Sequence, residues 1–289
     1  MRRHNRMKTG KNKKNRAAAA FLLPSLGGVA LFVLIPFADV VRRSFLDAMG
    51  IEFKGIENYL ELFHNSAFLL AVKNTMRFAF ICIPLLLVFS LGVAVLLSGV
   101  GKKGRILKNF YLIPMAVPVA SIVLLWKFLF HSRGFLSAFC SMVHLTPQDW
   151  MNSSAAFWVL VVSYLWKNMG YDIILWSAGL AAIPENLYEA AKVDGAGSLD
   201  CFFRITLPNL MPVFYTITVL SFLNSFKVFR EAYLVAGDYP HDSMYLLQHV
   251  FNNWFRELSL DKMAAGAVMT FLTVMILILL LQRAWGREE

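Results

Sequence analysis

The chain of 289 residues is 58% hydrophobic and only 16% charged, with a formal net charge of +10. This apolar share is well above that of ordinary globular domains and indicates an integral membrane protein with several spans. The positive charge does not indicate a nucleic acid partner, because eight of the 28 Lys and Arg residues lie in residues 1–16. A basic tail of this kind typically binds anionic membrane lipid.

Six apolar segments meet the length of about 20 residues that a helix needs to cross a bilayer. They predict an all-α integral membrane protein with six transmembrane helices, at residues 17–41, 72–98, 107–130, 156–181, 209–235 and 263–284. The first contains no charge from Ala17 to Ala38 and lacks a signal-peptide cleavage pattern, so we expect a retained span. The fourth is the least apolar, because Lys167 and Asp172 interrupt it.

Six prolines lie in or at the ends of these segments: Pro24, Pro36, Pro84, Pro114, Pro118 and Pro212. Transmembrane helices tolerate proline where neighbouring groups satisfy the freed backbone carbonyls. The prolines therefore do not argue against the predicted spans.

The distribution of Lys and Arg predicts the orientation in the membrane. With the N-terminus inside, the cytoplasmic flanks carry sixteen of these residues and the outer loops carry six. The outer six are Arg42, Arg43, Lys54, Arg133, Arg256 and Lys262. Both termini are therefore expected in the cytoplasm. In the first outer loop, about 42–71, the stretch IENYLELF predicts an amphipathic surface helix.

A polar segment, YEAAKVDGAGSLDCFFRITLP from Tyr188 to Pro208, lies between the fourth and fifth predicted spans. It begins with strong helix formers, which are Glu189, Ala190 and Ala191. Asp194 and Gly195 predict the end of this helix after about two turns. Ser198 is expected to cap a second short helix. The charge distribution places this segment in the cytoplasm, where it has the form of a docking element rather than a catalytic one.

Two motifs in this segment carry a resemblance to a known family. E-A-A-x-x-x-G at Glu189–Gly195, followed by I-x-L-P at Ile205–Pro208, resembles the signature loop of permease subunits of bacterial ABC importers. The longer string from IPENLYEAAKVDGA to FFRITLP is similar to the carbohydrate branch, which includes maltose, multiple-sugar and glycerol-phosphate permeases. GLAAIP, ENYLELF and FNNWF also fit that branch. The resemblance covers most of the chain from Ala17 onward.

The resemblance implies a six-span permease domain over 17–285, with its core from about 72, in the bacterial cytoplasmic membrane. It implies that the loop 183–208 couples the domain to a cytoplasmic ATPase dimer through its first helix. The coupling residues it implies are Glu189, Ala190, Ala191, Asp194, Gly195, Leu207 and Pro208. Further implied partners are a second, related permease, in a heterodimer, and an extracytoplasmic solute-binding protein.

Polar residues inside predicted spans mark a candidate substrate path, because they are costly in lipid and commonly face a solute pathway. The fourth and fifth spans contribute Trp166, Lys167, Asn168, Gly170, Tyr171, Asn224, Ser225 and Lys227. The resemblance implies that these two regions contribute to a sugar cavity at mid-membrane. Amides can bind sugar hydroxyls and aromatic rings can stack on sugar faces.

Several alternatives stay open at this level. Lys227 and Glu231 have the i,i+4 spacing of an intrahelical ion pair, and Lys167 is positioned to pair with Asp172 or with a partner subunit. The sequence leaves open whether Lys227, Arg230 and Glu231 bind substrate or only pair with each other. The cationic groups also suit an anionic solute such as a sugar acid or glycerol phosphate. A secondary transporter that works without an ATPase is the rival from another class.

Enzymatic chemistry is not expected. The sequence contains no G-x-x-x-x-G-K-[ST] phosphate-binding loop, so the energy source of an importer must be a separate chain. It also lacks an H-E-x-x-H pair and a G-x-S-x-G nucleophile turn. Cys82, Cys140 and Cys201 lie in or near different segments and predict neither a disulfide framework nor a metal site. No catalytic residue, metal or cofactor is therefore expected.

Overall fold

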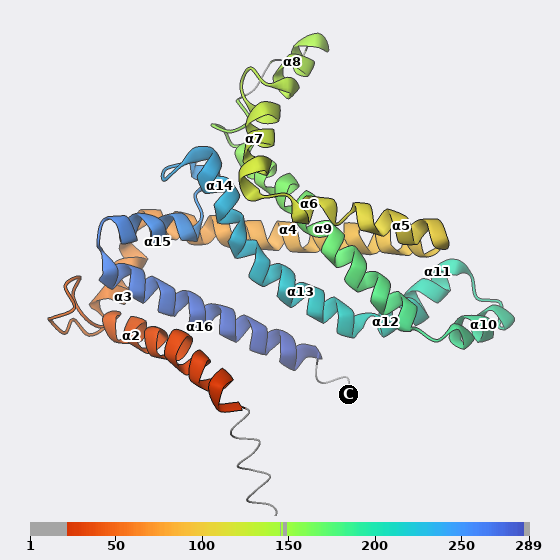
Figure 1. Ribbon diagram of the computed structural model, residues 1–289, viewed down its shortest axis with the longest axis horizontal. Coiled ribbons are helices and arrows are strands. Elements are labelled where there is room, and N and C mark those ends of the chain that lie inside the picture. The colour runs from red at the N-terminus through yellow and green to blue at the C-terminus, as the bar shows by residue number, and fades with distance from the viewer. Residues whose placement is uncertain (1–21, 145, 147–148, 286–289) are drawn as a thin grey trace, which may run out of the picture. The chain divides into compact units, whose positions relative to one another are not determined.

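The computed structural model describes residues 22–144, 146 and 149–285, which form helices joined by connecting segments (Figure 1). Within these residues, five helical stretches are long and apolar enough to cross a membrane: Leu22–Arg43, Ser66–Ser98, Val119–Met142, Met211–Ala236 and Leu260–Arg283. The all-α prediction is confirmed. The predicted basic tail at 1–16 and residues 17–21 of the first predicted span lie outside the described residues.

The fourth predicted span forms the helix α9 (Ala156–Ala182), which has 27 residues and is long enough to cross a bilayer. It is not among the five apolar helices. It packs along the 33-residue helix α4 (Ser66–Ser98) and buries Tyr164, Asp172 and Trp176. A helix that protein covers on much of its surface can be more polar than one surrounded by lipid. The count of six spans therefore stays a prediction.

The third predicted span, 107–130, is not one continuous helix. The region is divided into α5 (Lys102–Phe110), α6 (Ile113–Ala116), α7 (Val119–Phe130) and α8 (Phe135–Met142). Val117 and Pro118 have extended backbone, with ψ of 128° and 141°. Proline disfavours helical backbone at the preceding residue, so the helix cannot continue through Pro118. Figure 1 shows α7 leaving in a different direction from α5.

The fifth predicted span begins with α12 (Leu207–Asn209) and α13 (Met211–Ser225). A single 3₁₀ turn, η3 (Phe226–Val228), then connects α13 to α14 (Phe229–Ala236). Because a 3₁₀ turn has three residues per turn instead of 3.6, it changes which residues share a face. Beyond it lie η4 (Asp242–Met244), α15 (Leu247–Arg256) and α16 (Leu260–Trp285).

The described residues divide into two units, and the larger lies within residues 65–253 and 274–285. Two clusters of buried apolar side chains in its core are shared by α4 and α9. The first adds residues of α14 and η4, and the second adds residues of α13. A further cluster joins α7 to α9. Cys82 and Tyr164 belong to the first cluster, and Trp176 and Ile217 to the second. α9 is thus the central helix of this unit.

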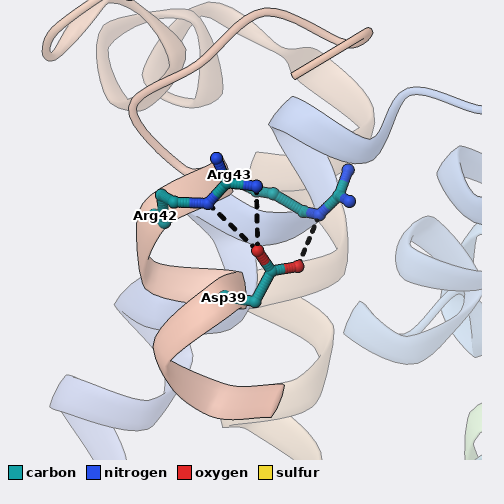
Figure 2. A network of polar contacts seen from close by, with 3 residues as sticks. All are labelled: Asp39, Arg42 and Arg43. Atoms are coloured by element: carbon teal, nitrogen blue, oxygen red, sulfur yellow. Dashed lines mark hydrogen bonds and ion pairs between the residues drawn. The ribbon is translucent and has the colours of Figure 1, made fainter. Parts of the chain in front are cut away.

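The other unit contains residues 22–64 and 254–273. Its first helix ends in η1 (Ala30–Leu34) and α2 (Ile35–Arg43). Figure 2 shows Asp39 accepting hydrogen bonds from Arg42 and Arg43 in the last turn, at 3.1 and 2.8 Å. These pairs hold the two arginines at the end of an apolar helix, where basic residues commonly mark the membrane–water boundary.

The amphipathic helix predicted from IENYLELF is present as α3 (Glu57–His64). The helix is amphipathic, with Leu62 fully buried and Phe63 exposed. The buried side-chain amide of Asn58 donates to the backbone carbonyls of Ser44 and Leu46, at 3.0 and 2.7 Å. These bonds fix α3 against the segment that leaves the first helix.

Candidate functional site

The segment Tyr188–Pro208 folds as two short helices joined by a tight turn. α10 (Glu185–Val193) carries Glu189, and its end forms a Schellman cap. The backbone N–H of Ala196 donates to the carbonyl of Ala191 at 2.9 Å, and that of Gly195 donates to Lys192 at 3.1 Å. Gly195 has φ of +80°, a conformation that glycine adopts without steric cost. The predicted break after Asp194 is therefore present.

The second helix, α11 (Ser198–Cys201), begins one residue earlier than a cap at Ser198 requires. Its N-cap is Gly197, and no side chain makes a capping hydrogen bond there. The expectation that Ser198 caps this helix is wrong, because Ser198 is already the first helical residue. The chain then continues through a π-helical stretch, η2 (Phe202–Thr206), into α12, which starts at Leu207 with Pro208 in its first turn. Proline fits there because no intrahelical N–H donor is needed.

One hydrogen bond ties the two ends of this segment together. The Tyr188 hydroxyl lies 2.8 Å from Oγ1 of Thr206, which is buried. A groove of about 510 Å³ lies beside this contact, between α10, α11, η2 and the adjoining ends of α4 and α9. The loop is therefore a braced structure and not a loose connection.

Four large apolar side chains of this loop are exposed among its polar residues. Leu187, Val193, Leu199 and Phe203 are each at least 39% exposed, and Val193 is 88% exposed. Of the predicted coupling residues, Glu189 and Ala190 are exposed and Ala191 is half-buried. Figure 1 shows α10 and α11 at the end of α13 that is remote from α14. An exposed apolar patch on a rigid element is typical of a protein docking surface.

A second feature is a cavity of about 180 Å³ between α6, α9 and the α13–α14 junction. Four of the predicted path residues line it: Lys167, Asn168, Asn224 and Lys227. The other lining residues are Met115, Ser163, Tyr164, Val228, Arg230 and Glu231. The structure thus brings together polar residues that are about 60 positions apart in the sequence.

The remaining predicted path residues do not line this cavity. The Trp166 ring packs against Trp126, with ring centroids 5.8 Å apart. Gly170 lies against the backbone of Tyr111, and Tyr171 is half-buried away from the cavity. Ser225 is buried and donates to the carbonyl of Phe222 at 2.6 Å. Within the described part of the chain, these four residues do not form part of the cavity wall.

The ion pairs considered from sequence are not the ones that form. Lys167 donates to Oε1 of Glu231, which links α9 to α14. Asp172 is buried and accepts from Oγ of Ser221 at 3.3 Å. Lys227 donates to Oδ1 of Asn224 at 2.7 Å instead of pairing with Glu231. The i,i+4 argument assumes one continuous α-helix, whereas Lys227 lies in the 3₁₀ turn η3 and Glu231 in α14.

Helical spacing on α9 could have identified the missed residues Ser163 and Tyr164. They lie three to four positions before Lys167 and therefore share its face. The sequence marks Arg230 and Glu231 as charged residues in an apolar segment. Whether they line the cavity depends on the 3₁₀ turn η3, which sets the helical face on which they lie.

Residues 86–287 match the family described as binding-protein-dependent transport system inner membrane component. The sn-glycerol-3-phosphate transport system permease protein UgpA of Yersinia enterocolitica is 30% identical over 262 residues, which are 88% of each chain. The trehalose/maltose transport system permease protein MalF of Thermococcus litoralis is 28% identical over 93% of each chain.

One solved structure shares the fold over nearly the whole chain. It is that of a bacterial ABC transporter involved in the import of the acidic polysaccharide alginate. The two chains superpose with a TM-score of 0.81 at 20% identity, over 97% of this chain and 99% of the other.

Proposed function

Because the chain belongs to the family of binding-protein-dependent transport system inner membrane components, we propose that it forms the translocation path of an ATP-driven importer for a sugar or oligosaccharide. The trehalose/maltose permease among its relatives supports this substrate class, and the glycerol-phosphate permease supports the alternative of an anionic solute. A second permease chain completes the path, and an extracytoplasmic binding protein delivers the solute.

The observation that carries the proposal is the rigid, exposed loop formed by α10 and α11. Its apolar surface suits a groove on a separate ATPase subunit, and the small Ala190 side chain permits close approach. Glu189 is exposed and available to pair with a basic residue of that partner. The braced connection from Tyr188 to Thr206 leads directly into α12 and α13. Movement of the ATPase is thereby transmitted to the fifth span.

The proposed topology has six spans within residues 17–285, with α9 as the fourth. Both termini and the coupling loop 183–208 lie in the cytoplasm, as the Lys and Arg distribution indicates. The cavity of Lys167, Asn168, Asn224 and Lys227 belongs to the substrate path. ATP hydrolysis takes place on the partner chain, and this chain transports without catalysing a reaction of its own.

Copurification tests the coupling surface. The tagged chain is purified from its own membrane, and ATPase activity and subunit content are measured. Wild type is expected to retain an ATPase chain, whereas Val193→Asp places a charge in the docking surface and reduces the retained ATPase at least tenfold. Met49→Asp changes a similarly exposed residue of the first outer loop, and this variant should retain the ATPase chain. Transport by wild type without any ATPase would support a secondary transporter instead.

A further inference from the structure

The charges around the cavity between α9 and the α13–α14 junction do not balance. Three of the lining residues are cationic, which are Lys167, Lys227 and Arg230, and one is anionic, which is Glu231. Lys167 and Glu231 form an ion pair with each other. Two positive charges, on Lys227 and Arg230, are left at the cavity wall.

Neither cation has a carboxylate partner in the described part of the chain. Nζ of Lys227 is held by a neutral group, Oδ1 of Asn224, at 2.7 Å. Arg230 lies on the next turn of the chain and lines the same cavity. Two uncompensated cations are unfavourable within a membrane-spanning segment unless an anion or water stabilises them. Arg binds carboxylates and phosphates through paired hydrogen bonds, and Lys is a common ligand of phosphate.

Glu231 supplies a different kind of contact. It is only 5% exposed, and Lys167 occupies Oε1. The other oxygen, Oε2, is buried without a hydrogen-bond partner within the described residues. A buried carboxylate oxygen without a donor is costly, so a hydroxyl group of a bound solute would stabilise it. The cavity volume of about 180 Å³ is below the 300–1,000 Å³ of drug-sized sites and suits a small solute.

We propose that this cavity binds a hydroxylated organic anion, such as a sugar acid or a sugar or polyol phosphate. Lys227 and Arg230 hold the anionic group, and Oε2 of Glu231 accepts a hydrogen bond from a hydroxyl of the solute. This inference rests on the proposed transport function and specifies the chemical class of its substrate. Arg230 and Glu231 become specificity-determining residues of the path.

The test measures equilibrium binding of labelled solutes to the purified importer complex in nanodiscs, without the binding protein. Glucuronate is compared with glucose, and glycerol 3-phosphate with glycerol. We expect at least one anion of the two pairs to bind at least tenfold more tightly than its neutral counterpart, with affinity falling as salt rises. The two pairs distinguish a carboxylate from a phosphate as the anionic group.

Variants assign the binding to this cavity. Lys227→Gln and Arg230→Gln alter exposed side chains and are each expected to weaken anion binding at least tenfold. Lys127→Gln removes an exposed lysine of α7 that does not line the cavity, and it should leave binding unchanged. Glu231→Gln is expected to lower the preference for glycerol 3-phosphate over propyl phosphate several-fold while retaining phosphate binding. If Glu231 had only a structural role, Glu231→Gln would weaken the binding of glycerol 3-phosphate and of propyl phosphate equally.

Equal affinity for each anion and its neutral counterpart would overturn the inference. The inference would also be overturned if Lys227→Gln and Arg230→Gln lost the second permease chain while anion binding stayed unchanged. The two cations would then pair with groups across the subunit interface. The ATPase content of the same preparations separates the two proposals. If the ATPase copurifies but no anion binds, only the substrate class is wrong; if no ATPase is present, the transport mechanism itself is wrong.

Discussion

Single residues set how closely the helices of the larger unit can approach. Gly170 on α9 lies against the backbone carbonyl of Tyr111, and a Cβ atom at this position would overlap that carbonyl oxygen. Gly170 was predicted to be a substrate-path residue. The structure instead gives it a packing role, because only glycine allows α9 to pass the α5–α6 connection at this distance.

Gly170→Ala is therefore expected to destabilise the protein by about 2–3 kcal/mol, since backbone atoms of Tyr111 must move to make room. Thermal unfolding of the purified protein measures the change. Gly92→Ala on α4 is the matched control, because no atom lies within 4 Å of the added Cβ. It should be neutral or slightly stabilising, as alanine favours helix. Equal unfolding temperatures for both variants would refute the packing role.

His249 on α15 is a residue whose protonation should affect stability. Its side chain is fully buried, Nδ1 accepts from the backbone N–H of Leu246 at 3.0 Å, and its ring contacts Phe229 and Tyr245. Burial lowers the pKa of His249 from its usual 6.5 to about 4. The folded protein therefore keeps this imidazole neutral at pH values where the unfolded chain protonates it.

Stability is accordingly expected to be unaffected by this group above pH 6.5 and to fall as the pH decreases from 6.5 towards 4. At pH 5 the loss amounts to about 2 kcal/mol. Unfolding temperatures at pH 5, 6 and 7 measure it. His249→Gln should reduce the slope between pH 7 and 5, whatever its effect on stability at pH 7. An unchanged slope would show that other groups cause the pH dependence.

At the level of elements, the end of α10 and the turn to α11 decide the shape of the coupling loop. The Schellman cap at Gly195 reverses the chain within three residues, and the Tyr188–Thr206 hydrogen bond holds the two arms together. The sequence signals for this turn were strong, because Asp-Gly after a helix leaves few other conformations.

Gly195→Ala is expected to destabilise the loop by about 1 kcal/mol, because alanine is unfavourable at φ of +80°. The expected result is faster proteolytic cleavage within 185–208 and less retained ATPase, with unchanged membrane insertion. Gly197→Ser is the control, since Gly197 has φ of −76° at the N-cap of α11, where serine is favoured. Equal cleavage rates in the two variants would contradict the role of the cap.

At the level of the whole molecule, the proposed topology assigns each exposed loop to one side of the membrane. Val193→Cys and Met49→Cys introduce reactive thiols at positions that are 88% and 82% exposed. Both variants are prepared in a background in which Cys140 and Cys201 are replaced by serine. Cys82 is retained because it is buried. A membrane-impermeant maleimide is expected to label Met49→Cys in spheroplasts and Val193→Cys only after lysis. Labelling of Val193→Cys before lysis would reverse the proposed orientation.

The sequence by itself determined the all-α class, the membrane location and the helix–turn–helix form of the loop 183–208. These features depend on composition, on apolar segment length and on local backbone preference, which are properties of consecutive residues. The same reasoning placed the surface helix α3 and the limits of α9 within a residue or two.

Only the tertiary structure decided which polar residues meet. The break at Pro118 and the 3₁₀ turn at 226–228 change direction and helical face, so spacing along the sequence no longer predicts neighbours. Lys167 therefore pairs with Glu231 and not with Asp172, and Arg230 reaches the cavity while Trp166, Gly170, Tyr171 and Ser225 do not. Pairing across helices depends on their packing, and packing is a property of the whole fold.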